Sequence, residues 1–253
     1  MKKHDSLAIG FVVVLALVAF FEIGFYSGLQ RAAAEDSVSL ERLSGVPLEA
    51  SAKIVSVTPD GSGSVNEGDV EIVPGSGRIL LSLNPFAEPD TQDSMQTAAL
   101  VAQRFTGKSL EDKDVIFSVK NTPARLIGGP SAGAAMSVAA IAAIRGENVR
   151  ADAAITGTIN ADGTIGQVGG VIEKATAAAE QGLSLFVVPK GQKEVTYYEQ
   201  REERSQQGRV LVIRRYYVPR TINLEEMLAD QNYGTKIAEA ADIGEAVDLL
   251  ISK

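Results

Sequence analysis

Hydrophobic and polar positions follow three different patterns along this chain. Residues 6–21 contain no charged residue and read SLAIGFVVVLALVAFF. From about residue 48 to residue 190, short apolar runs alternate with stretches whose apolar residues recur at helical spacing, and Gly- and Pro-rich turns separate them. Beyond residue 190 the pattern weakens and charges become dense. The patterns predict an apolar segment over 1–29, a linker over 30–47, and a domain over 48–253 in which 191–235 is a charged insertion.

The N-terminal apolar run is long enough to cross a membrane. Taken as a helix over residues 7–26, it would measure roughly 30 Å, the thickness of a bilayer core. Lys2 and Lys3 precede it, so the positive-inside rule predicts a single-pass cell-membrane protein with its folded domain on the extracytoplasmic side. A cleaved signal peptide is the alternative, because three alanines at 32–34 suit a signal peptidase. A buried core helix is disfavoured, since the run is apolar on every face.

Within the domain, the pattern predicts strands and helices in mixed order. The predicted strands cover 50–58, 70–73, 78–83, 115–119, 151–155, 185–188 and 210–213, and residues 160–163 (Asn-Ala-Asp-Gly) have the composition of a hairpin turn. The predicted helices cover 90–104, 131–144, 171–181 and 243–251, and the charged stretch 194–207 reads as an exposed helix. Asp90 or Thr91 is the expected N-cap of the first helix, and Gly182 the C-cap of the third. Because no regular βαβ repeat is present, the expected fold class is α+β.

Composition narrows the chemistry that the chain can carry out. A net charge of −8 argues against nucleic acid as the main partner, because phosphate binding needs a basic surface. The chain has no cysteine, and its one histidine, His4, lies ahead of the apolar run. These counts exclude a Ser-His-Asp triad, a cysteine nucleophile and a His-Glu-x-x-His zinc site within one chain. If the protein hydrolyses a bond by covalent catalysis, a lysine must be the base.

Two glycine-hinged helix starts carry residues for such chemistry. GGPSAG (128–133) places Ser131 at the start of an alanine-rich helix, where unpaired N–H groups and the helix dipole favour an oxyanion. GGVIEK (169–174) opens a second helix, and the alanines after Lys174 suit a burial that would lower the pKa of its amine. We therefore predict Ser131 as nucleophile and Lys174 as base, with the backbone of Gly129, Pro130 and Ala132 around the oxyanion. A serine that merely caps its helix is the structural alternative.

Several motifs, in this order and spacing, resemble the proteolytic domain of the Lon protease family. They are GGPSAGAAM (128–136), TG (156–157), G-x-I-G-Q-V-G-G-V-x-E-K (163–174) and FVVPK (186–190). The resemblance implies a Lon-type proteolytic domain of the ribosomal protein S5 domain 2-like fold, preceded here by one transmembrane helix. It implies a serine endopeptidase that cleaves polypeptides through an acyl-enzyme and needs no cofactor or metal. In that scheme Ser131 attacks, Lys174 is the general base, and Thr156 orients the lysine.

The chain also departs from the family pattern. Gly128 stands where the bacterial family has an aspartate, and Thr158 where it has a glutamate, which puts carboxylate assistance in question but leaves the dyad. No G-x-x-x-x-G-K-[ST] phosphate loop is present. We therefore expect an ATP-independent enzyme that acts on flexible polypeptides or depends on a separate unfolding partner. The family's usual ring makes a homo-oligomer a candidate assembly.

Two other functions fit parts of the sequence. A phosphate-binding protein related to small-molecule kinases of the GHMP type would explain the Gly-rich turn at 128–133, but it leaves Lys174 without a role. A catalytically inactive Lon-like scaffold would explain the fold, although Ser131, Thr156 and Lys174 are all present. Covalent labelling of the serine separates both alternatives from a hydrolase.

Overall fold

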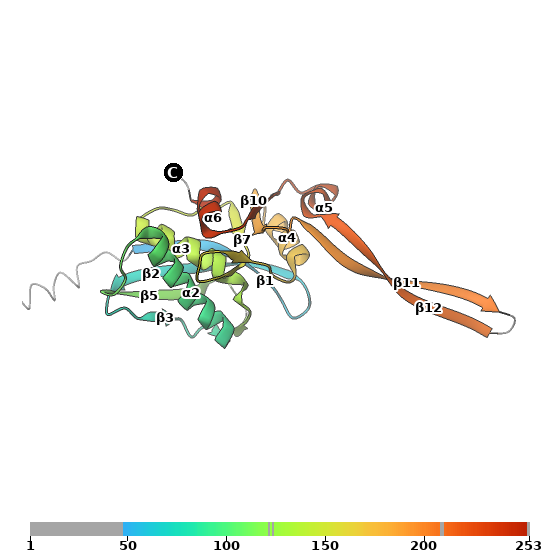
Figure 1. The fold of residues 1–253 in the computed structure, drawn as a ribbon, viewed down its shortest axis with the longest axis horizontal. Coiled ribbons are helices and arrows are strands. Elements are labelled where there is room, and N and C mark those ends of the chain that lie inside the picture. The colour runs from blue at the N-terminus through green and yellow to red at the C-terminus, as the bar shows by residue number, and fades with distance from the viewer. Residues whose placement is uncertain (1–47, 121, 123, 208–209, 252–253) are drawn as a thin grey trace, which may run out of the picture. The chain divides into compact units, whose positions relative to one another are not determined.

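The computed structural model describes residues 48–253, apart from 121, 123, 208–209 and 252–253 (Figure 1). The predicted apolar segment at 1–29 and the linker at 30–47 lie outside the described residues, and both stay predictions. Among the residues that are described, no helix has both the length and the apolar character needed to span a bilayer.

A seven-stranded mixed sheet forms the centre of the domain, with strand order β13-β10-β7-β1-β2-β5-β3. Its strands are β1 Leu48–Val57, β2 Gly63–Pro74, β3 Ile79–Leu81, β5 Lys113–Lys120, β7 Ala153–Ile155, β10 Leu185–Pro189 and β13 Lys236–Ala240. The strands from β13 to β1 are parallel to their neighbours, whereas β2 runs antiparallel to both β1 and β5. The predicted mixture of strands and helices is confirmed, but the expected absence of βαβ units is wrong for one half of the sheet. There, α4 (Val171–Glu180) connects the parallel strands β7 and β10, and α5 (Leu224–Asp230) lies in the connection between the parallel strands β10 and β13.

Helices cover both faces of this sheet. They are α2 Pro89–Thr106, α3 Gly133–Arg145, α4 Val171–Glu180, α5 Leu224–Asp230 and α6 Ile243–Leu250. Alternate residues of β10 serve the two faces: Leu185 and Val187 pack in the core with α2, α3 and α6, whereas Phe186 and Val188 pack in the core with α4 and α5. Because β10 is covered on both sides, its sequence is a continuous apolar run and does not alternate.

Short elements connect the sheet to the helices. They are β4 Phe86–Ala87, which pairs with β6 Leu126–Ile127, then β8 Thr158–Ile159, which pairs with β9 Ile165–Gly166, and the 3₁₀ turn η1 Pro130–Ala132. The antiparallel pairing of β8 and β9 confirms the hairpin predicted at 160–163, and Gly163 supplies a φ of 87° there.

The first helix begins earlier than the sequence indicated. Glu88 is the N-cap residue of α2, and Pro89 occupies its first turn, where a missing N–H costs nothing. Asp90 and Thr91 already lie within the helix, so the predicted N-cap was wrong. At the other predicted cap, Gly182 follows the C-cap residue of α4 by one position and has a φ of 71°.

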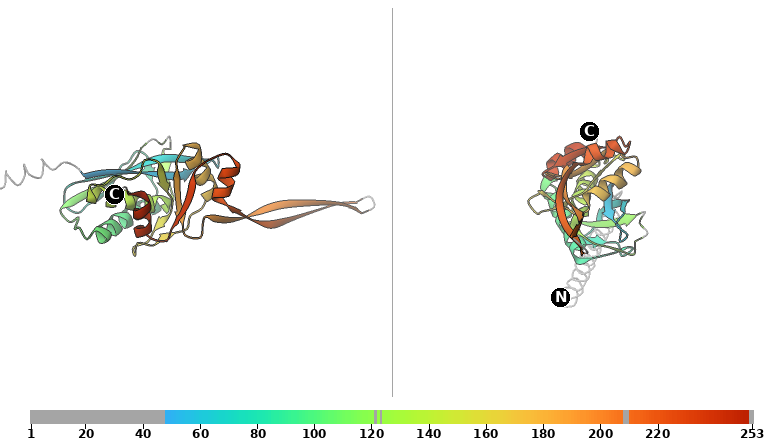
Figure 2. Two further views of the ribbon diagram at one scale, coloured as in Figure 1. Left: turned by 90° about the horizontal axis from the view of Figure 1, so that it is seen from above. Right: turned by 90° about the vertical axis from the view of Figure 1, so that its right-hand side faces the viewer.

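Residues 194–207 are not the helix that their charge density suggested. They form β11 Glu194–Gln207, which pairs along its whole length with β12 Val210–Asn223 in a separate two-stranded sheet, here called the arm. Both strands leave the domain beside α5 and run away from the main sheet (Figures 1 and 2). The prediction failed because the charges serve cross-strand pairs such as Glu202 with Arg215, 3.0 Å apart, and Glu199 with Arg220, 3.1 Å apart.

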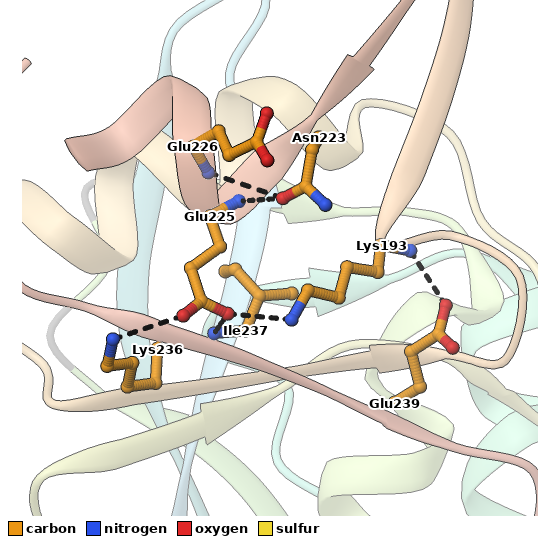
Figure 3. Close-up of polar contacts among 7 residues, drawn as sticks. All are labelled: Lys193, Asn223, Glu225, Glu226, Lys236, Ile237 and Glu239. Carbon is orange, nitrogen blue, oxygen red and sulfur yellow. Dashed lines mark hydrogen bonds and ion pairs between the residues drawn. The ribbon is translucent and has the colours of Figure 1, made fainter. Parts of the chain in front are cut away.

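Two glutamates fix the root of the arm to the domain (Figure 3). Glu225, in the first turn of α5, binds Lys193 Nζ at 2.7 Å and Lys236 Nζ at 3.1 Å. Glu239 Oε1 accepts hydrogen bonds from the backbone N–H groups of Gly191 and Lys193, each at 2.9 Å. Because Lys193 directly precedes β11, and Lys236 and Glu239 lie on β13, these contacts tie the arm to the edge strand of the sheet.

Candidate active site

Ser131 lies in the turn that joins β6 to α3. Gly129 has a φ of 85°, a conformation that glycine adopts without strain, and Pro130 begins η1. Side chains of α2 hold this turn from one side. Thr91 Oγ1 donates to the carbonyl of Gly129, and Ser94 Oγ donates to the carbonyl of Pro130, both at 3.2 Å. The helix that packs against α3 therefore also positions the backbone that presents Ser131.

The loop after β7 holds the same turn from another direction. The carbonyl of Ser131 accepts hydrogen bonds from the N–H of Gly157 at 3.0 Å and from Thr156 Oγ1 at 3.4 Å. The N–H of Ala134, in turn, donates to the carbonyl of Gly157 at 3.1 Å. Thr156 is fully buried, so its hydroxyl depends on partners inside the protein.

Lys174 lies one turn into α4, which starts after Gly170 in a left-handed conformation. The lysine is only 3% exposed, and its Nζ donates a hydrogen bond to Thr156 Oγ1 at 3.2 Å. Burial lowers the pKa of Lys174 from its ordinary 10.5 to about 8, and the neighbouring carboxylate of Glu173 opposes this shift only in part. A large share of this amine is therefore neutral at mildly alkaline pH, as a general base requires.

One cleft, with a volume of about 470 Å³, contains both predicted catalytic side chains. Its lining residues are Ser56, Val57, Gly128, Gly129, Pro130, Ser131, Thr158, Gln167, Val168, Gly169, Gly170 and Lys174. Lys174 Nζ is hydrogen-bonded to Thr156 and not to Ser131 Oγ. The structure thus brings Ser131 and Lys174 into the same cleft. Thr156 connects them, because its hydroxyl accepts a hydrogen bond from the amine of Lys174 and donates one to the carbonyl of Ser131.

One of the three backbone positions predicted around the oxyanion is chemically unsuitable. Pro130 has no N–H and cannot donate, so its inclusion was wrong. The N–H of Gly129 makes a long contact of 3.4 Å with Asp90 Oδ1, which a bound oxyanion could replace. Ala132 follows Ser131 within η1. The N–H groups of Gly129 and Ala132 are the candidate donors that remain.

A smaller cavity of about 50 Å³ also borders Ser131. Its apolar wall is made by Ile54, Val55, Leu81, Met95, Val119, Ile127, Ala132 and Met136. Polar contributions come from Ser56, Thr91 and Asn66, whose Nδ2 donates to Ser56 Oγ at 3.2 Å. None of the residues that line this cavity is charged. It therefore suits an uncharged side chain next to the serine.

Sequence reasoning missed several residues that position the site. Thr91 and Ser94 lie three apart on the buried face of α2, a spacing that was visible in the sequence. Gln192 accepts from the N–H of Val168 at 3.0 Å and donates to its carbonyl at 2.8 Å, which fixes the loop along the cleft. Nothing in the local pattern around Gln192 indicates this contact, because its partner is 24 residues away.

The fold and the site define a mixed α/β domain with a serine at a helix-start turn and a buried lysine in one cleft. Residues 94–201 match the family model of the Lon protease (S16) C-terminal proteolytic domain. This region contains Ser131, Thr156 and Lys174. The predicted resemblance to the Lon proteolytic domain is therefore confirmed for this part of the chain.

Known Lon proteases are similar to part of the chain. The chain is 32% identical over 144 residues, 55% of its length, to a peroxisomal Lon protease homolog 2 of Caenorhabditis briggsae. It is 34% identical over 137 residues, 53% of its length, to Lon protease 2 of Thermus thermophilus, and 33% identical over 121 residues, 46% of its length, to a Lon protease of Phenylobacterium zucineum. The matched stretch covers 18%, 17% and 15% of these relatives, so the chain spans less than a fifth of their length.

Proposed function

We propose that this chain is a serine endopeptidase that cleaves polypeptides through an acyl-enzyme formed on Ser131, with Lys174 as the general base. The observation that carries the proposal is the buried amine of Lys174 in the same cleft as Ser131, with a pKa of about 8. An exposed lysine would be almost fully protonated near neutral pH and could not accept the serine proton.

In the proposed reaction, Ser131 Oγ attacks the scissile carbonyl while its proton passes to Lys174 Nζ. This transfer requires a staggered χ1 rotamer of Ser131 in which Oγ lies within hydrogen-bond distance of the amine. The N–H groups of Gly129 and Ala132 stabilise the oxyanion, and the protonated lysine then gives its proton to the leaving amine. Water activated by the same lysine hydrolyses the ester and restores the serine hydroxyl.

Thr156 is assigned a positioning role in this scheme. Its hydroxyl bonds to Lys174 Nζ and to the carbonyl of Ser131, so it keeps the amine next to the turn that carries the nucleophile. Replacing Thr156 with Val keeps the shape of the side chain and removes both hydrogen bonds. We expect a lower kcat with little change in KM, and a changed pH–rate profile.

The substrate side of the proposal rests on the uncharged cavity beside Ser131. A peptide with an apolar residue on the acyl side of the scissile bond could place that side chain among Ile54, Met95 and Met136. We further propose that the enzyme is anchored to the cell membrane by residues 7–26, with its domain on the extracytoplasmic side. It hydrolyses no ATP itself, in keeping with the absence of a phosphate-loop motif from the sequence.

A fluorophosphonate probe tests the central assignment. Wild-type protein should become labelled and should cleave unfolded casein, whereas Ser131→Ala should do neither. Ser137→Ala is a matched control, because Ser137 lies on α3, the helix that follows the turn with Ser131, and its hydroxyl donates to the carbonyl of Gly133. Labelling that persists in Ser131→Ala, or a wild type that is never labelled, contradicts the proposal. If the wild type is never labelled but binds a nucleotide in calorimetry, the kinase-like alternative is favoured.

A further inference from the structure

Two exposed surfaces outside the cleft are chemically complementary to each other. One lies on the arm and combines tyrosines with arginines. The other lies beside the cleft, where β4, β6 and the start of α2 meet, and combines large apolar side chains with carboxylates. We infer that the arm of one molecule docks on this second surface of another copy of the same chain. The inference does not depend on the proposed peptidase activity.

The first surface is one face of the arm. Residues directly opposite in an antiparallel pair share a face, as do residues two positions apart. The register therefore places Tyr198, Glu202, Arg204, Arg215 and Tyr217 together, here called the arm face. Tyr198 is 68% exposed and Tyr217 65%. Tyr and Arg are the residue types that contribute most to protein–protein interfaces.

The arm face carries an unbalanced positive charge. Glu202 binds both Arg204, at 2.6 Å, and Arg215, at 3.0 Å, so one arginine charge is left over. This imbalance is notable in a chain whose net charge is −8. Residues 194–223 hold six arginines against four glutamates, and neither lysine nor aspartate. The arm is thus a basic element on an acidic protein, and it needs an acidic partner surface.

The second surface, here called the rim patch, supplies that chemistry. Its apolar part consists of Leu83, 75% exposed, Phe86, 61% exposed, and Leu126, 55% exposed, with Phe86 and Leu126 paired across β4 and β6. Its acidic part consists of Glu88, Asp90 and Asp93, all exposed and without an ion pair among the described residues. Arg125 is the basic residue that adjoins it. Asp90 contacts Gly129 of the cleft, so the patch borders the active-site turn.

The arm cannot reach the rim patch of its own chain. Within the described part of the chain, β11 and β12 pair with each other and with no other strand, and Figure 1 shows both strands running away from the domain. A two-stranded ribbon is only marginally stable in water unless it packs against something else. Its root is nevertheless held in place by Glu225 and Glu239, as expected for an element that must meet a partner in a fixed direction.

This contact joins different surfaces of two copies and is therefore heterologous. Repeated from copy to copy, it closes into a ring or continues as a filament. Because the rim patch borders the turn with Gly129, the arm of each molecule would lie beside the cleft of its neighbour. In the inferred interface, the arm of one subunit thus adjoins the candidate active site of the next.

Charge inversion on the full-length chain tests the contact. Arg204→Glu, Glu202→Arg and Arg215→Glu together preserve the internal ion pairs of the arm but reverse the net charge of the arm face. Glu88→Lys with Asp93→Lys reverses the rim patch. Each inversion alone should dissociate the assembly seen by sedimentation velocity, and the two combined in one chain should restore it. Glu49→Lys with Glu111→Lys is the matched control and should not change the assembly, because both carboxylates are exposed and neither forms an ion pair with a residue that the structure describes.

A second variant examines the apolar part of the contact. Tyr198→Ser with Tyr217→Ser should weaken association by roughly thirtyfold or more, the effect typical of interface hot spots. A wild type that stays monomeric at all concentrations overturns the inference. So does an assembly that survives both single inversions and the tyrosine variant. If the rim-patch inversion changes KM for peptides while the assembly is unchanged, the patch is a substrate surface and not an interface.

Discussion

The cleft and the arm differ in what holds them together. α3, which starts at the turn that carries Ser131, has a continuous run of buried residues from 133 to 143, and Lys174 is one of the buried residues of α4. The arm is mostly exposed and relies on backbone pairing and surface ion pairs. Buried apolar area contributes about 25 cal/mol per Å², whereas an exposed ion pair contributes about 0–1 kcal/mol. Substitutions in the two regions should therefore affect the protein differently.

The largest effect is expected at Lys174. Lys174→Met keeps a flexible apolar side chain of similar length but has no amine, so proton transfer is lost. Peptidase activity should fall by about 10²–10⁴-fold, measured as kcat/KM on a fluorogenic peptide. In the wild type, kcat/KM should rise with pH through about 8, as the amine loses its proton. Full activity in Lys174→Met would contradict the assigned role.

The same substitution should remove a pH dependence of stability. The pKa of Lys174 is about 8 in the folded protein and ordinarily 10.5, so between these values the unfolded chain binds more protons. The wild-type free energy of unfolding should therefore rise across this window, by about 3 kcal/mol. Urea titrations below and above the window measure the rise. The difference in this slope between wild type and Lys174→Met isolates the lysine, and equal slopes would show that the buried amine does not titrate there.

A core substitution gives the next largest effect. Phe186 is fully buried on the face of β10 that packs with α4 and α5, so Phe186→Ala should lower the free energy of unfolding by about 3–5 kcal/mol. Tyr217→Ala in the arm removes a similar ring from an exposed position and should change the free energy of unfolding by less than about 0.5 kcal/mol. Chemical denaturation of both variants tests the contrast, and comparable losses would mean that the arm packs more tightly than described.

A smaller effect is expected at the contact between β2 and α4. A Cβ on Gly63 would lie 2.2 Å from the carbonyl oxygen of Glu173 and 2.6 Å from Cβ of Ala177. Gly63→Ala should therefore displace α4, lower the free energy of unfolding by about 1–3 kcal/mol and reduce kcat through Lys174. Gly234→Ala is the control, because a Cβ there meets no atom within 4 Å. Equal stability of the two variants would show that α4 yields without cost.

The smallest effect is expected at the root of the arm. Lys193 and Lys236 lower the pKa of Glu225 to about 2, from an ordinary 4.5. Its contribution to stability is therefore present above about pH 4.5 and is lost as pH falls towards 2. Glu225→Gln should lower the free energy of unfolding by about 1 kcal/mol at neutral pH, and less in acid. Glu226→Gln, whose carboxylate makes no ion pair among the described residues, should leave it unchanged.

The elements around the cleft could be predicted from the sequence, whereas the arm could not. Buried elements were predictable because burial imposes a period: 185–188 and 131–144 appeared as an apolar run and an alanine-rich helix, and both exist with small shifts at their ends. Ser131 and Lys174 could be selected because glycine hinges and the exclusion of His and Cys left few candidates, whereas Thr156 was indicated only by the resemblance to the Lon family. Their common cleft could not be derived from spacing, since it depends on how α3, α4 and β7 pack.

The arm lacked the signal that guided the other predictions. An exposed ribbon has no buried face, so neither a period of 3.6 nor one of 2 dominates residues 194–207. A usable signal was present in the partner strand, where 210–222 is rich in Val, Ile, Tyr and Thr. Two Tyr-Tyr pairs, at 197–198 and 216–217, also fall one in each strand. The N-cap of α5 was also not predicted: the side chain of Asn223 accepts hydrogen bonds from the backbone N–H groups of Glu225 and Glu226.

The hydroxyl of Thr156 has a directional consequence for the lysine. A hydroxyl has a single proton, and the hydroxyl of Thr156 donates it in a hydrogen bond to the carbonyl of Ser131. The oxygen of Thr156 can therefore only accept a hydrogen bond from Lys174, and the amine donates one of its N–H groups to it. When the amine is uncharged, its nitrogen lone pair is therefore not used in this contact and can accept a proton from a donor in the cleft.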